Sequence, residues 1–171
     1  MAPQTKRAAE TPKLGVQKAA VIAAAFLSAI TAGAMANISM ISVPVFMDTN
    51  TNPNHMIAQW SRTYHYGHII LPGICVGTCG LYAFSALRSN KNWRRYALAG
   101  ITTLSLVPFT WVFMTPTNNT LFALEAAGNV SDLGYVQQLV VKWTWLHATR
   151  SMFPLIGAIL GFTGIMADLE R

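Results

Sequence analysis

The sequence predicts an all-α fold, a bundle of four transmembrane helices, and three observations lead to this prediction. The 171 residues are 53% hydrophobic and only 11% charged, whereas soluble domains have about 25% charged residues. Apolar segments close to the ~20 residues that cross a hydrocarbon core occur four times. Lys and Arg lie mostly between these segments, so the formal net charge of +6 indicates membrane orientation and argues against a nucleic-acid partner.

Four segments are predicted to be the transmembrane helices. The first covers residues 19–46 and is long enough to tilt or to project from the bilayer. The other three cover residues 65–87, 97–115 and 145–167. The helices and their connections form one predicted membrane domain over residues 18–171. Residues 1–17 are largely polar and are predicted to form a disordered cytosolic tail.

The orientation in the membrane follows from the positions of Lys and Arg. The chain before the first helix contains four of them and residues 88–96 contain four more, whereas residues 48–64 and 116–144 contain one each. Because Lys and Arg accumulate on the cytosolic side, we expect both termini to be cytosolic and the two longer connections to face outward. Residues 119–136 contain enough apolar side chains to predict a short helix over the outer mouth of the bundle.

Two further features belong to the predicted outer side. Sequons for N-glycosylation begin at Asn118 and Asn129. Tryptophans that we expect to form an aromatic belt at the outer interface are Trp60, Trp111, Trp143 and Trp145.

An internal repeat relates the two halves of the chain. Residues 45–52 and 112–119 are identical at four of eight positions without gaps. The second and fourth helices both contain the pattern His-x-x-basic-x-x-x-Pro, at residues 65–72 and 147–154. The sequence therefore predicts two tandem hairpins related by a pseudo-twofold axis along the membrane normal.

Histidines and one arginine are the candidate catalytic residues. His65 and His68 share a helix face, as do His147 and Arg150, and the pseudo-twofold axis would point both pairs at one cavity near the outer end. Arg150 is the only fixed charge within the four segments, and such a charge is costly unless it faces a polar interior. Further side chains that we expect to bind a substrate in this cavity are Asn37, Tyr64, Thr110, Trp111, Asn118 and Trp145.

A cavity of this composition suits a flat, weakly acidic and largely apolar molecule. An arginine would stabilise a phenolate or enolate, and a histidine would take up a proton. No Gly-rich phosphate loop and no nucleotide-binding fingerprint occurs in the sequence.

The chain resembles the anthrone oxygenase family, small membrane proteins of fungal aromatic polyketide pathways. The resemblance rests on Pro108-Phe109-Thr110, on residues 116–121 (Pro-Thr-Asn-Asn-Thr-Leu) and on residues 143–150 (Trp-Thr-Trp-Leu-His-Ala-Thr-Arg), and it extends over roughly residues 20–167. It implies a monooxygenase that uses O₂ to oxidise the central methylene of a tricyclic anthrone to an anthraquinone, without an added cofactor. It also implies the endoplasmic reticulum membrane. On this basis we expect His65 or His68 to remove the proton, and Arg150 with His147 to stabilise the anion.

Two alternatives remain open at this point. Imidazole suits both copper and iron. Candidate ligands of such a metal are His65, His68 and His147, with His55 as an additional ligand if its segment folds toward them. A non-enzymatic scaffold or transporter subunit is the other alternative, although it would not need imidazoles and a guanidinium at one depth. The predicted partners are O₂, a flat aromatic substrate and the lipid bilayer, and a homo-oligomer is left open.

Overall fold

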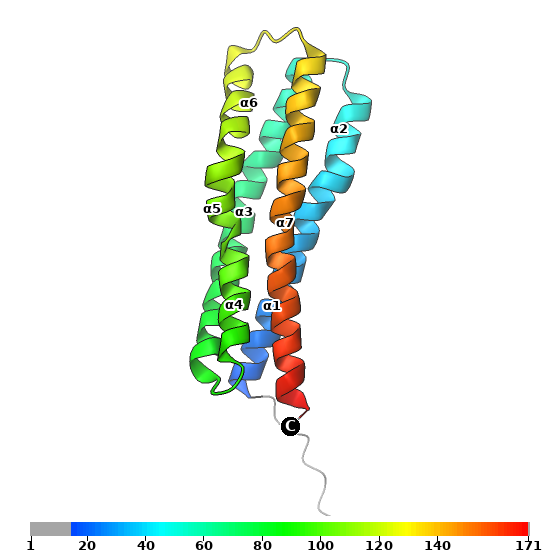
Figure 1. Ribbon diagram of the computed structural model, residues 1–171. Coiled ribbons are helices and arrows are strands. Elements are labelled where there is room, and N and C mark those ends of the chain that lie inside the picture. Colours follow the sequence, from blue (N-terminus) through cyan, green and yellow to red (C-terminus); the bar gives the residue numbers. More distant parts are fainter. Residues whose placement is uncertain (1–14, 171) are drawn as a thin grey trace, which may run out of the picture.

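The computed structural model describes residues 15–170, and within them the chain is helical with no strands. The helices form four rods, which run side by side (Figure 1). They cover Val16–Thr49, Pro53–Arg88, Trp93–Ala127 and Leu133–Leu169, and each is long and apolar enough to cross a membrane. The predicted all-α bundle of four transmembrane helices is confirmed. Of the predicted tail, residues 1–14 lie outside the described residues, and Val16 and Gln17 already belong to the first helix.

Two of the four rods are interrupted by a short π-helical turn. The first rod consists of α1 (Val16–Asn37), the π-helical turn η1 (Ile38–Ser42) and α2 (Val43–Thr49). The third consists of α4 (Trp93–Leu104), α5 (Leu106–Phe109), the π-helical turn η2 (Thr110–Met114) and α6 (Thr115–Ala127). The second and fourth rods are the single helices α3 (Pro53–Arg88) and α7 (Leu133–Leu169).

The rods pack in the order expected for two consecutive hairpins. Both α1 and α4 pack against α3 and α7, so the first and the third rod each contact both the second and the fourth. Lys18 Nζ donates to the backbone carbonyl of Asp168 at 3.1 Å, which places the start of α1 and the end of α7 at the same end of the bundle. We call this the terminal end, and the opposite end, with the connections at residues 50–52 and 128–132, the distal end.

The distal connections are much shorter than the sequence predicts. Asn52 caps α3 by accepting from the backbone N–H of Asn54 and His55, and Asp132 caps α7 in the same way through Tyr135. Gly128, with a φ of 67°, ends α6 in the left-handed conformation that glycine tolerates. The predicted short helix over residues 119–136 is therefore corrected. Residues 119–127 belong to α6, which continues the third rod upright (Figure 1), and residues 133–136 already begin α7, so no separate helix covers the mouth within the described residues.

An apolar core at the distal end explains why these helices extend beyond the segments predicted from the sequence. Its buried members come from all four rods: Val43, Met56, Ile57, Trp60, Met114, Leu121, Val136, Val140 and Trp143. The rings of Trp60 and Trp143 meet edge to face with centroids 6.0 Å apart. These two tryptophans are 0% and 2% exposed, so their predicted place in an interfacial belt is wrong. Trp111 and Trp145, 71% and 72% exposed, fit such a belt.

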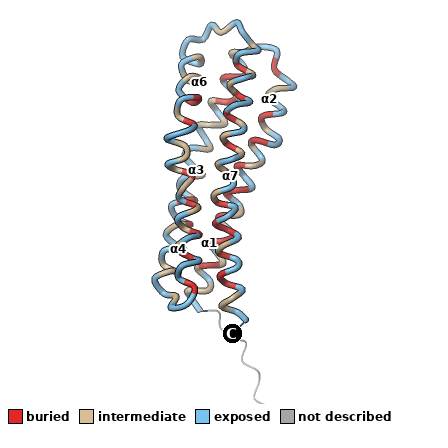
Figure 2. The backbone as a smooth tube through the Cα atoms, in the orientation of Figure 1, coloured by how far each residue is buried: buried red, intermediate tan, exposed pale blue. Residues whose placement is uncertain are grey.

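Part of the bundle extends beyond the bilayer. Exposed large apolar side chains predominate on α7 from Trp145 to Met166, a length of about 33 Å at 1.5 Å per residue, which matches a hydrocarbon core of about 30 Å. The first turns of α7, residues 133–144, include the exposed polar residues Gln138 and Lys142 and add about 18 Å. The distal core therefore resembles that of a soluble bundle, with buried positions on the facing sides of the helices (Figure 2).

The terminal half of the bundle is closely packed around glycines of α7. Tyr82 of α3 donates to the carbonyl of Gly157 at 2.9 Å, and its ring lies where a side chain at Gly161 would be. Tyr96 of α4 occupies the equivalent space at Gly164. These close approaches hold α3, α4 and α7 together with little room for a ligand.

A proline lies two residues after the end of each π-helical turn. Pro44 follows η1 and Pro116 follows η2, and the two turns are as far apart in the chain as the two prolines. The backbone N–H groups before the prolines reach back five residues, from Val43 to Ile38 and from Thr115 to Thr110. Because a proline ring crowds the carbonyl four residues earlier, the wider turn relieves this contact. This equal spacing of turns and prolines supports the predicted internal repeat. The two matched eight-residue segments are separated by a different number of residues.

Candidate active site

A cavity of about 310 Å³ lies where the close-packed terminal half meets the distal core. Toward the terminal end α3 packs against α4, and toward the distal end it packs against α6, whereas α5 and η2 pack against α7. The cavity lies beside α3 between these contacts. Its volume is at the lower end of the range of about 300–1,000 Å³ for small-molecule sites. The apolar part of its lining consists of Met35, Ile38, Leu71, Pro72, Leu106 and Val107.

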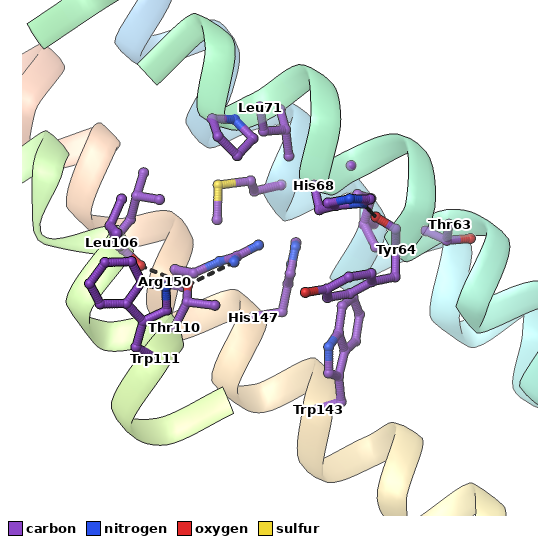
Figure 3. A pocket seen from close by; sticks show the side chains of 15 residues that line it. Thr63, Tyr64, His68, Leu71, Leu106, Thr110, Trp111, Trp143, His147 and Arg150 are labelled. Atoms are coloured by element: carbon purple, nitrogen blue, oxygen red, sulfur yellow. Dashed lines mark hydrogen bonds between the residues drawn. The ribbon is translucent and has the colours of Figure 1, made fainter. Parts of the chain in front are cut away.

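Arg150 of α7 is the only charged side chain among the residues that line this cavity. Its guanidinium points into the cavity (Figure 3), where Nη1 donates to the hydroxyl of Thr110 at 2.9 Å. Nε is buried and makes no hydrogen bond with any described residue, and within residues 15–170 no Asp or Glu lines the cavity. A guanidinium in an apolar environment costs free energy unless an anion pairs with it. The cavity therefore favours binding of an anionic group beside Arg150.

His147 lies one turn before Arg150 on the same face of α7. Only 2% of it is exposed, and its Nδ1 lies 3.2 Å from the hydroxyl oxygen of Ser39. Its ring stacks on Trp143 with centroids 4.5 Å apart and an interplanar angle of 24°. Packing and hydrogen bonding therefore hold this imidazole in one orientation at the cavity wall (Figure 3).

His68 of α3 lines the cavity from the opposite side and is more exposed than His147. Its Nδ1 lies 3.1 Å from the backbone carbonyl of Tyr64, and its ring stacks on that of Tyr64 at 5.3 Å and 18°. Because a carbonyl can only accept a hydrogen bond, Nδ1 of the neutral ring has the proton and Nε2 has the lone pair.

The structure brings together six of the ten predicted site residues and not the other four. His68, His147, Arg150, Tyr64, Thr110 and Trp111 line the cavity. His65 is exposed and touches only the edges of its neighbours, with its ring 5.7 Å from that of His68. Asn37 and Trp145 are exposed on the outside of their helices. Asn118 is buried further along α6, beyond the cavity.

Helix rotation explains which predicted residues line the cavity. On α3 the residues facing it include Tyr64, His68 and Pro72, four apart, so His65 is turned by about 100° from Tyr64. On α7 the facing residues are Trp143, His147 and Arg150, which places Trp145 on the other side of the helix.

Several residues of the site were missed in the sequence, and three of them matter most for its chemistry. Ser39 and Met35 contribute from the first rod, and Trp143 supports His147. The four-residue spacing from His147 could have identified Trp143. Ser39 belongs to no motif, and only the packing of the first rod against α7 reveals it.

The alternative metal site is not assembled in this structure. Within residues 15–170, no three side chains of His, Cys, Asp or Glu are grouped to hold a metal ion. His65 lies on another face of α3, and His55 lies beside Arg62 on a separate depression between α2 and α3.

The four membrane-length helices indicate a multi-pass membrane protein, and the cavity between them is its candidate small-molecule site. Residues 60–160 match the family described as anthrone oxygenase, and the chain belongs to this family. It is 45% identical over 164 residues to the anthrone oxygenase nsrD of Aspergillus novofumigatus, covering 94% of this chain and 99% of that protein. It is 49% identical over 157 residues to the anthrone oxygenase AgnL2 of Paecilomyces divaricatus, covering 86% and 93%.

A more distant relative has the same type of activity in its name. The noranthrone monooxygenase of Aspergillus flavus is 36% identical over 162 residues, covering 91% of this chain and 75% of that protein. No solved structure matches the chain. The resemblance to the fungal family is confirmed, and with it the class of enzyme, an oxygenase and therefore an oxidoreductase.

Proposed function

We propose that this protein oxidises the central methylene of a tricyclic anthrone with O₂ to give an anthraquinone and water. The names of its relatives supply the substrate class. The observation that carries the proposal is the Arg150 guanidinium, which faces an apolar cavity beside two imidazoles and has no carboxylate partner in the cavity lining. The conjugate base of an anthrone is a flat apolar anion, and this cavity suits both properties.

The reaction requires a base, a cation and a dry pocket. An imidazole of the site removes one methylene proton, and the electron pair delocalises onto the ketone oxygen, where Arg150 stabilises it. The anion gives one electron to O₂, and the radical and superoxide combine to form the carbon–oxygen bond of a peroxide. The imidazolium returns its proton to the peroxide. Loss of the second methylene proton with cleavage of the O–O bond then gives the ketone and water.

The remaining side chains of the site bind and shield the substrate. Aromatic rings stack with flat aromatic ligands in offset or edge-to-face geometry, and Tyr64, Trp111 and Trp143 offer such rings in the cavity lining. The apolar walls limit access of water, which strengthens the interaction of Arg150 with a developing anion. Of the three histidines proposed from the sequence, His68 and His147 are positioned to take the proton, because His65 faces away.

The direct test is oxidation of a hydroxylated anthrone by membranes that contain the expressed protein. We expect quinone formation and oxygen uptake in a 1:1 ratio, well above the spontaneous rate in membranes without the protein. We propose that no added cofactor is required, so activity should persist after purification in a chelator. Stoichiometric bound metal whose removal abolishes activity would replace this part of the proposal by a metal-dependent oxidation, and no rate above background would favour a non-enzymatic role.

His65 and His68 form a matched pair for testing which face of α3 binds the substrate. We expect His68→Gln to lower kcat/KM about tenfold, the equivalent of one lost contact of about 1.4 kcal/mol, because this ring lines the cavity. His65→Gln should stay within about twofold of the wild type, since its ring lies outside the cavity. Steady-state kinetics in proteoliposomes measure both, and an equal loss in the two variants would contradict the assigned face.

We also propose that the terminal end faces the cytosol and the distal end faces the lumen of the endoplasmic reticulum. Basic side chains support this orientation, because Lys and Arg near the membrane are enriched on the cytosolic side. Those near the terminal end are Lys18, Arg88, Lys91, Arg94 and Arg95. Apart from Arg150 in the cavity, the distal half contains only Arg62 and Lys142 among the described residues.

Glycosylation of Asn129 tests this orientation. Asn129 is exposed in the distal connection, whereas Asn118 is 4% exposed within α6 and inaccessible to a transferase. We expect one N-linked glycan, seen as a mobility shift on glycosidase treatment, that is lost in Asn129→Gln and kept in Asn118→Gln. A wild-type protein without glycan, together with modification of a sequon engineered into residues 89–92, would reverse the orientation.

A further inference from the structure

Each π-helical turn presents a hydroxyl to one of the two polar groups that α7 contributes to the cavity. Ser39, in η1, lies 3.2 Å from Nδ1 of His147. Thr110, the first residue of η2, accepts from Nη1 of Arg150 at 2.9 Å. π-helical turns are rare in proteins, and those that occur are frequently found at functional sites. Two of them beside one cavity, each touching a different candidate catalytic residue, indicate that the turns serve the site.

The contacts of Ser39 restrict where the protons lie. Its hydroxyl oxygen is also 3.4 Å from the backbone carbonyl of Thr144, and a carbonyl can only accept a hydrogen bond. If the Ser39 hydroxyl donates to this carbonyl, the hydroxyl oxygen can accept from Nδ1–H of His147. Both donors of this short series of hydrogen bonds then have an acceptor. Nε2 of His147 then has the lone pair.

The opposite arrangement is less favourable in this cavity. A proton on Nε2 would add a further donor to a cavity that Arg150 of the same helix face already supplies with donors only. No carboxylate among the described residues lines the cavity to accept from either group. The arrangement with Nδ1–H bonded to Ser39 avoids this accumulation of donors.

We propose that Ser39 is a positioning residue that holds His147 with its proton on Nδ1, so that Nε2 of His147 is the base that removes the methylene proton. This inference rests on the proposed oxidation of an anthrone. The proton moves from carbon to Nε2, the electron pair stays on the substrate, and Nδ1–H remains bonded to Ser39. The proton on Nε2 is later returned to the peroxide. His68 has no comparable support from another rod, since its Nδ1 bonds only to the backbone of its own helix.

The test compares three substitutions in η1. Ser39→Ala removes the hydroxyl and Ser39→Thr keeps it. Ser42→Ala is the matched control, because Ser42 lies in the same turn and its side chain does not line the cavity. The readouts are kcat, KM and the primary kinetic isotope effect with an anthrone deuterated at the methylene. A purely structural role of Ser39 would not raise this isotope effect, whereas loss of a positioned base makes proton removal slower and more rate-limiting.

For Ser39→Ala we expect kcat to fall on the order of tenfold to a hundredfold, within the contribution of a positioned general base, with little change in KM and a larger isotope effect. Ser39→Thr should recover most of the rate, and Ser42→Ala should behave as the wild type. His147→Gln, which can still donate a hydrogen bond but has no basic nitrogen, should lose at least a hundredfold in kcat.

The outcomes separate this proposal from the proposed function. An active wild type in which Ser39→Ala keeps its kcat and isotope effect would overturn the positioning role alone. An active His147→Gln would overturn the assignment of the base, and this readout does not depend on the folding of the Ser39 variant. A wild type that does not oxidise anthrones would overturn both the function and the assignment.

Discussion

Arg150→Gln is expected to lower kcat/KM for anthrone oxidation by about 10²- to 10³-fold, the usual effect of removing one group that stabilises an oxyanion. Among the described residues that line the cavity, Arg150 is the only charged group, and glutamine keeps a donor but not the charge. The loss should appear mainly in kcat, because the substrate gains its negative charge during the reaction. Steady-state rates of quinone formation in proteoliposomes measure it.

Arg62→Gln is the matched control for this prediction. Arg62 is exposed and lies on the separate depression near the distal end, so the same change of charge there should leave kcat/KM within about twofold, as is usual for surface sites. Arg150→Lys should keep part of the activity, because an ammonium retains the charge but not the planar fork that guanidinium offers to an oxyanion. Full activity of Arg150→Gln would exclude Arg150 as the stabilising cation.

Gly157→Ala is expected to destabilise the protein by about 1–3 kcal/mol, the typical cost of overpacking. A Cβ at this position would overlap the hydroxyl of Thr103 and would lie 3.0 Å from the backbone carbonyl of Ala99. The hydroxyl of Thr103 already donates to this carbonyl at 2.8 Å, so it cannot turn away without losing that bond. The contact between α4 and α7 must therefore widen.

Thermal unfolding in detergent measures this effect, with an expected decrease in Tm of a few to about 10 °C. Gly77→Ala is the control, since Gly77 lies within α3 and a Cβ there meets nothing within 4 Å. Alanine is the better helix former by up to about 1 kcal/mol, so Gly77→Ala should be neutral or stabilising. Equal losses in the two variants would show that the contact at Gly157 does not limit the packing.

The two halves of the bundle have different roles in this arrangement. The terminal half is held together by the contacts of Tyr82 and Tyr96 with glycines of α7, and the distal half by its own apolar core. The cavity lies between them, at the level of the π-helical turns. Catalytic side chains on rigid helices supported from both sides keep their geometry better than side chains on loops.

Much of the fold could be predicted because the relevant signals are local. Hydropathy over about 20 residues identifies a membrane helix without knowledge of its neighbours, so all four rods were found. Arg150 was identified for the same reason, since a charge in an apolar segment is costly wherever the segment packs. The short motif around His147 and Arg150 likewise led to the correct family.

The helix ends and the composition of the site were decided by tertiary structure. Beyond the bilayer, α3, α6 and α7 continue because Trp60, Leu121 and Trp143 bury one another, and no local hydropathy signal reports such mutual burial. Which side chain enters the cavity depends on how each helix is rotated about its axis. A π-helical turn contains one extra residue, which rotates everything beyond it by about 100°. Ser39 faces His147, whereas Asn37, two residues earlier and therefore on the opposite side of the helix, faces outward. Only the packed bundle determines which of these two faces meets the cavity.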